Sequence, residues 1–248
     1  MEWGRDRTVT ALGLTGLTAL GWLYLLRDTE GGVVCMLMMS PITHRWTTEE
    51  FGAVFLMWSV MMVAMMVPSA SPMILSFATV NQKRRERGAD YVPTAVFLGG
   101  YLLAWTAFSL IATIAQWGLQ RAELVASSMR SASPVLTGVL LIVSGVFQWT
   151  PLKQRCLTHC HTPLTLLMTH WKEGRRGALE MGLHHGAYCV GCCWALMGLL
   201  FVAGVMNLWW IAALSAIVLA EKLAPRLLSK PMGPLLIAAG IWFVAAGN

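Results

Sequence analysis

Two short segments of this chain concentrate side chains that bind soft metal ions. The first is Cys156-Leu-Thr-His159-Cys160-His161, in which two cysteines lie four residues apart. On a helix this spacing places Cys156 and Cys160 on one face, with His159 beside them. Two thiolates and an imidazole can hold zinc or copper(I). The alternative is a pair of reduced cysteines without a ligand role.

The second segment is His184-His185-Gly-Ala-Tyr-Cys189-Val-Gly-Cys192-Cys193. His185, Cys189 and Cys192 follow the spacing i, i+4, i+7 and form one helical stripe, which Cys193 borders. Cysteine in an apolar helix is usually a packing residue, because it behaves as a small hydrophobe. Three cysteines within five residues, one turn beyond two histidines, favour metal binding over packing.

A ridge of thioethers precedes both segments, and Pro68 and Pro72 follow it closely. Methionines at helical spacing usually pack against lipid or core. The prolines free backbone carbonyls, however, and a membrane helix tolerates this only inside a bundle or beside a cavity. The ridge is therefore predicted to face the interior. The members of this methionine ridge are Met57, Met61, Met62, Met65 and Met66.

We expect the ridge and the cysteine stripe to meet. Both reach the same predicted depth, and the glycines beside the cysteines allow another helix to approach closely. Met65 or Met66 should then lie within about one side chain of Cys189 or Cys192. Thioether, thiolate and imidazole together favour copper(I), with zinc second.

The composition decides which elements position these residues. Of 248 residues, 56% are hydrophobic and 12% are charged, the latter roughly half the usual globular share. So few charges exclude a disordered chain and a nucleic-acid-binding module, and argue against a soluble domain. We predict an all-α polytopic membrane bundle that forms a single domain over residues 1–248.

About 20 apolar residues are needed to cross a bilayer, and seven segments approach this. The sixth is short and is predicted to form a hairpin with the fifth. The seven predicted spans are Val9–Leu26, Phe51–Val67 (with a possible extension to Thr79), Pro93–Trp117, Pro134–Trp149, Leu183–Met206, Leu208–Ala220 and Gly233–Gly247.

Basic residues orient these spans. With seven crossings and the N-terminus inside, fourteen of the 18 Lys and Arg residues fall on the inner side. The positive-inside rule favours this orientation over the reverse. It also argues against reading Cys156–His161 as a c-type haem attachment, because haem is attached on the outer side. Retinal is set aside because the last span has no lysine for a Schiff base.

Two further residues are weaker candidates. Glu221 ends the sixth span beside Lys222, and acids at such depth are often functional; a plain interfacial pair is the alternative. Cys35 is predicted to lie outside without a cysteine partner on that side, either as a free thiol or as an accessory ligand.

Together these segments resemble a bacterial family described as predicted metal-binding integral membrane proteins, over residues 51–248. The resemblance implies a multispan protein of the inner membrane with a metal site, and no established reaction. His161 departs from the family's pattern, which more often has a basic residue there. The shared motifs are Met61-Met62-Val-Ala-Met65-Met66-Val-Pro68-Ser-Ala, Thr150-Pro151-Leu152-Lys153 followed by Cys156, Cys160 and Pro163, His185-Gly186 with Cys189 and Gly191-Cys192-Cys193-Trp194, and Glu221-Lys222.

Three functions remain open. The first is a membrane protein that binds copper(I) or zinc and moves it, or delivers it to a metallochaperone or metalloenzyme, rather than an enzyme. The second is a thiol–disulfide relay, and the third is a non-catalytic assembly subunit whose cysteines only pack. The expected metal ligands are Met65, Met66, Cys156, His159, Cys160, His185, Cys189, Cys192 and Cys193.

Overall fold

The structure is a computed structural model that describes residues 3–29, 46–88, 91–125, 133–162, 167, 169 and 171–246. Helices are its regular elements over these ranges, in agreement with the predicted all-α class. They are α1 (Trp3–Thr29), α3 (Thr48–Glu86), α4 (Thr94–Arg121), α5 (Pro134–Phe147), α6 (Pro151–His161), α8 (Gly174–Gly198), α9 (Leu200–Ala203), α10 (Leu208–Leu223) and α11 (Pro225–Ala246).

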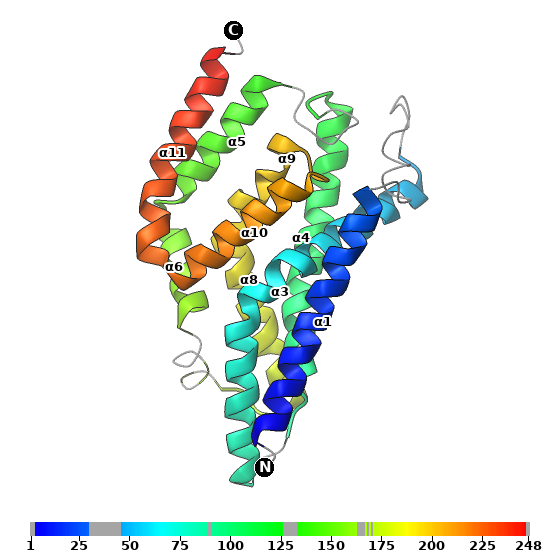
Figure 1. Cartoon of the computed structure of the whole chain (residues 1–248), viewed down its shortest axis with the longest axis vertical. Coiled ribbons are helices and arrows are strands. Elements are labelled where there is room, and N and C mark those ends of the chain that lie inside the picture. The colour runs from blue at the N-terminus through cyan, green and yellow to red at the C-terminus, as the bar shows by residue number, and fades with distance from the viewer. Residues whose placement is uncertain are drawn as a thin grey trace.

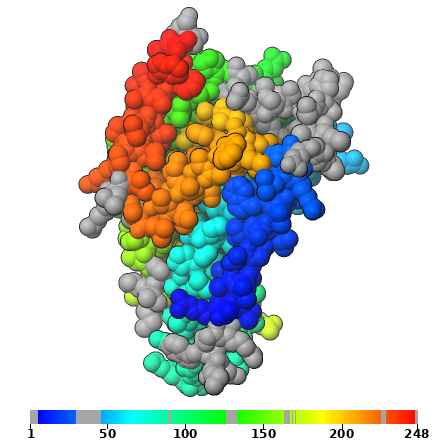
Figure 2. Space-filling view, in the orientation of Figure 1, coloured from blue at the N-terminus to red at the C-terminus, as the bar shows by residue number. Residues whose placement is uncertain are grey.

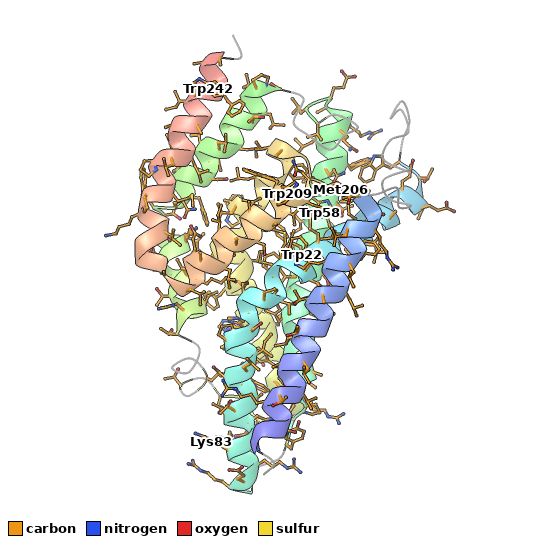
Figure 3. The ribbon with its side chains drawn as sticks, in the orientation of Figure 1. Trp22, Trp58, Lys83, Met206, Trp209 and Trp242 are labelled. Atoms are coloured by element: carbon orange, nitrogen blue, oxygen red, sulfur yellow. The ribbon has the colours of Figure 1, made fainter. Side chains whose placement is uncertain are left out.

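The helices form an elongated bundle (Figure 1). α1 begins at its lower end and α11 finishes at its upper end. Lys83, near the end of α3, marks the lower end, and Trp242 on α11 marks the upper end (Figure 3). Three long pairings hold the bundle together: α1 with α3, α4 with α8, and α5 with α11. Figure 2 shows α1, α10 and α11 covering the face toward the viewer.

Within the described ranges, five segments are long and apolar enough to cross a membrane by themselves: α1, α3, α4, α8 together with α9, and α11. A sixth span results if α5 and α6 are taken as one broken crossing, although they are bent by 66° relative to each other. α10 has 16 residues and is shorter than a usual crossing. The chain is thus a helical membrane protein with several spans, and the seven-span topology stays a prediction.

The break between α5 and α6 turns the first cysteine segment toward the bundle. Pro151 occupies the first turn of α6, where its missing N–H costs nothing. Thr150 caps this helix, since its side-chain oxygen accepts from the backbone N–H of Lys153 at 3.3 Å. α6 then packs along α8 and also contacts α10.

The methionine ridge lies in the interior, as predicted. Each of its five side chains is at most 1% exposed. Pro68 and Pro72 lie inside α3, where each removes one helical hydrogen bond. Figure 1 shows α3 changing direction along its length. The lipid-facing alternative for these methionines is wrong.

Glycines set the closest helix pairing, as predicted for the glycines beside the cysteines. A Cβ at Gly182 would lie 2.0 Å from the Phe97 carbonyl oxygen of α4, and one at Gly100 would lie 2.1 Å from the Leu179 carbonyl oxygen of α8. The α4 and α8 backbones therefore touch at points where no side chain fits. This contact fixes the height of the α8 cysteines relative to α4.

Two neighbouring glycines on α4 test this contact. Gly100→Ala should lower the free energy of unfolding by about 1–3 kcal/mol, because its methyl group meets the α8 backbone. A Cβ at Gly99 meets nothing within 4 Å, so Gly99→Ala should leave stability unchanged or slightly raised. Thermal unfolding of both variants in detergent measures the difference, and equal stability would contradict the described pairing.

Candidate metal centre

The two cysteine segments meet between α6 and α8. The Sγ atoms of Cys160 and Cys192 are 4.0 Å apart. One turn away, Gly191 makes room for Cys156, because a Cβ at position 191 would lie 2.9 Å from the Cys156 Sγ. Cys156 is buried and Cys160 is half-buried. Segments that are more than 30 residues apart in sequence thus form one cluster of sulfurs.

The separation of Cys160 and Cys192 suits a shared soft ion. Zinc–thiolate bonds are about 2.3 Å long. Two such bonds to sulfurs 4.0 Å apart enclose an S–metal–S angle of about 120°. This lies in the range of trigonal and tetrahedral coordination. All five described cysteines are free thiols, which leaves their sulfurs available as ligands.

Cys189 is the most enclosed sulfur of the cluster. Its Sγ lies 2.9 Å from the Lys222 Nζ of α10 and 3.2 Å from the Tyr101 hydroxyl of α4. Its backbone carbonyl accepts from the thiols of Cys192 at 3.1 Å and Cys193 at 2.9 Å. An ammonium group beside a sulfur compensates negative charge there, so this position can hold a thiolate out of water.

The methionine ridge reaches the sulfurs through other side chains. The Tyr101 hydroxyl donates to the Met66 carbonyl at 3.0 Å, and the Lys222 ammonium donates to the Ser69 hydroxyl at 2.7 Å. α3 packs chiefly on α1 and α4. The expected direct packing of the second span (α3) on the fifth (α8) is therefore replaced by a link through Tyr101 and Lys222. Met65 and Met66 stay predicted ligands.

A buried ion pair lies beside the cluster and joins α6 to α10. The Lys153 Nζ of α6 lies 2.7 Å from the Glu221 Oε2 of α10, and both side chains are at most 3% exposed. At the end of α6, His161 Nδ1 donates to the Lys222 carbonyl of α10 at 2.9 Å. Glu221 therefore does not pair with its neighbour Lys222, as the alternative held. Glu221 pairs with Lys153, and Lys222 contacts Cys189.

The predicted histidine ligands lie beside the sulfurs rather than among them. His185 is buried and stacks on Phe97 and Tyr101. His159 stacks on Tyr188, with ring centroids 4.0 Å apart. Over the described ranges, no three His, Cys, Asp or Glu side chains are grouped closely enough to hold one metal ion. Of the nine predicted ligands, the structure brings the sulfurs of Cys160 and Cys192 face to face, with the other cysteines nearby and the imidazoles at the side. Cys35 lies outside the described residues.

Four residues of this cluster were not predicted as parts of the site: Ser69, Tyr101, Lys153 and Lys222. Lys153 belongs to the Thr-Pro-Leu-Lys motif and Ser69 to the methionine motif. A lysine four residues after a span end in so apolar a chain indicates that its side chain can be buried and paired with an acid. Tyr101 carries no such signal, because an aromatic residue within a span usually packs.

Comparison with known families supports the membrane and metal character of the chain. A family model described as PpoB2, copper chaperone, matches residues 55–243. This region includes the ridge, the α6 cysteines and the α8 stripe. Searches of curated proteins and of solved structures found no match. The matched region covers well over half of the chain, which therefore belongs to the PpoB2 family of copper chaperones.

Proposed function

We propose that this protein binds one copper(I) ion between α6 and α8 and delivers it to a partner protein. The observation that carries the proposal is the 4.0 Å separation of the Cys160 and Cys192 sulfurs, which come from different helices. A site that joins two helices forms only when the fold is correct. Binding of the ion and the packing of α6 on α8 then stabilise each other.

Copper(I) is favoured over zinc by the ligands. Cys160 and Cys192 would supply two thiolates, Cys156, Cys189 and Cys193 offer further sulfurs nearby, and the ridge offers the thioethers of Met65 and Met66. Sulfur ligands of this kind select copper(I), whereas zinc sites more often include imidazole or carboxylate. His159 and His185 flank the cluster and are suited to brief ligation during transfer. Membership of a copper chaperone family supports the same metal.

The sequence contains no ATP-binding motif that would power transport. Transfer of the ion would then depend on ligand exchange with a partner protein. We expect a metallochaperone that supplies the ion or a metalloenzyme that receives it. We also propose that the protein is a single domain of the inner membrane with its N-terminus inside. The positive-inside rule supports this orientation, and the chain runs from the lower to the upper end of the bundle (Figure 1).

An anaerobic titration tests the proposal. Purified, reduced protein should take up copper(I) to about one ion per chain in competition with a chromogenic copper(I) chelator. It should then pass the ion to an added apo copper protein. Failure of the reduced protein to compete at any chelator concentration would contradict the proposal.

The same pair of sulfurs also permits the thiol–disulfide relay. That function predicts that Cys160 and Cys192 cycle between thiol and disulfide and form mixed disulfides with a partner. Alkylation followed by mass spectrometry of protein from cells distinguishes the two. Copper delivery requires both thiols reduced in the working protein, and the relay requires a substantial oxidised fraction. An assembly subunit predicts that cysteine-to-serine changes leave its function intact.

A further inference from the structure

A cleft of about 430 Å³ lies next to the sulfur cluster, between α3, α6 and the first half of α8. Its lining is rich in groups that bind soft metals. Three histidines and two methionines border it, together with a tyrosine and an ion pair between Lys172 and Glu180. The metal-binding side chains in the wall are Met73, His159, Met181, His184 and His185.

His159 is oriented as a metal ligand would be. Its Nδ1 lies 2.9 Å from the Arg155 carbonyl oxygen. A carbonyl oxygen only accepts, so Nδ1 carries a proton, and in the neutral imidazole Nε2 keeps its lone pair. A backbone carbonyl on the second ring nitrogen is the arrangement that fixes ligating histidines. The free Nε2 is therefore available to an ion in the cleft.

Tyr188 brings a second imidazole close to the first. The His159 ring stacks on the Tyr188 ring at 4.0 Å, and the His184 ring meets it edge-on at 4.8 Å. The two histidines thus come from different helices and flank one aromatic side chain. Neither histidine is fully buried, so both are accessible from the cleft.

The deep wall of the cleft leads to the sulfurs. His185 lines the cleft and is itself only 6% exposed. It stacks on Tyr101, with ring centroids 5.8 Å apart, and the Tyr101 hydroxyl lies 3.2 Å from the Cys189 Sγ. Met73, on the opposite wall, is 5% exposed and continues the methionines of α3 toward the cleft.

We propose that this imidazole and thioether cleft is the port through which copper(I) reaches the sulfur cluster. The inference rests on the proposed copper function. An ion held by His159 and His184 would pass to His185 and Met73, and then to the thiolates, by exchanging one ligand at a time. Imidazole and thioether bind copper(I) more weakly than thiolate does, so the exchange runs toward the cysteines.

The surroundings of the cleft indicate the side from which the ion comes. Lys172 lines the cleft, and the neighbouring Glu173 pairs with Arg84 at the end of α3. Basic residues gather at this lower end of the bundle, which the positive-inside rule assigns to the cytoplasm. The port therefore opens to the cytoplasmic side.

Kinetics of copper(I) exchange test the port. In the full-length protein, His159→Gln/His184→Gln should slow loading from a copper(I)–chelator complex about tenfold. Removal of bound copper by excess chelator should slow by the same factor, because the ion leaves by the path it enters. The equilibrium copper content should stay that of the wild type. A matched control, His44→Gln, replaces a histidine that is predicted to lie on the opposite side of the membrane and should exchange copper at the wild-type rate.

The outcomes separate this inference from the function on which it rests. Wild-type exchange rates in the double variant would overturn the port and leave the copper site standing. A fall in equilibrium content as large as that of the cysteine variants would also overturn it, since the histidines would then retain the ion. No copper uptake by the wild type would overturn both. Circular dichroism of the helical signal checks that the double variant folds. Folding is expected to persist because neither His159 nor His184 is buried.

Discussion

Replacing Cys160 and Cys192 together by serine is expected to reduce bound copper(I) from about one ion per chain to nearly none. These are the sulfurs that face each other across the α6–α8 contact at 4.0 Å. Serine hydroxyls are hard ligands that do not replace thiolates for a soft ion. Loss of the two thiolates also removes the link that a bound ion would form between α6 and α8. Copper content after anaerobic reconstitution and desalting measures the effect.

Cysteine variants are expected to differ in how much copper affinity they lose. Cys189→Ser should weaken copper binding strongly, because it leaves the Lys222 ammonium beside a poor ligand in a buried position. Cys35→Ser is the matched control, since Cys35 is predicted to lie on the opposite face of the membrane. Full copper retention by the Cys189→Ser/Cys192→Ser double variant would remove the α8 stripe from the site.

The second large effect concerns the buried ion pair that braces α6 against α10. Glu221→Leu should lower the free energy of unfolding by about 3–5 kcal/mol, because it leaves the Lys153 ammonium buried without a counter-charge. Adding Lys153→Met should restore most of this stability, since an apolar pair of similar size replaces both charges. Denaturation of the two variants in mixed micelles measures the recovery.

An exposed ion pair serves as the control for this cycle. Lys172 and Glu180 also pair, but both side chains are more than half exposed. Their pairing is screened by solvent, so Glu180→Gln should leave stability unchanged. If the Lys153→Met/Glu221→Leu variant is no more stable than Glu221→Leu alone, the two residues are not coupled in the way described.

Much of the fold followed from local patterns. The apolar runs located α1, α3, α4, α8 and α11, which are long enough to cross a membrane. The i, i+4, i+7 spacing placed His185, Cys189 and Cys192 on one face of α8. Glycines beside the cysteines correctly indicated a close helix contact at Gly182. Burial of the methionine ridge followed from the prolines next to it. Each of these inferences depends on residues that are near one another in sequence.

What could not be predicted depends on how helices turn relative to one another. The 66° bend at Thr150 brings Lys153 to Glu221 and Cys160 to Cys192, and nothing in the local sequence gives that angle. For the same reason Glu221 was paired with its sequence neighbour Lys222. The link from α3 to Cys189 runs through Tyr101 and Lys222, whose roles depend on three helices meeting at one point.

X-ray absorption at the copper edge, on reduced protein loaded with one equivalent of copper(I), tests the central claim most directly. The account predicts a copper(I) edge with sulfur neighbours at about 2.2–2.3 Å as the main shell. That sulfur shell should be lost in the Cys160→Ser/Cys192→Ser variant and kept in His159→Gln/His184→Gln. A first shell of nitrogen or oxygen in the wild type, or an unchanged sulfur shell in the cysteine variant, would contradict a copper site between α6 and α8.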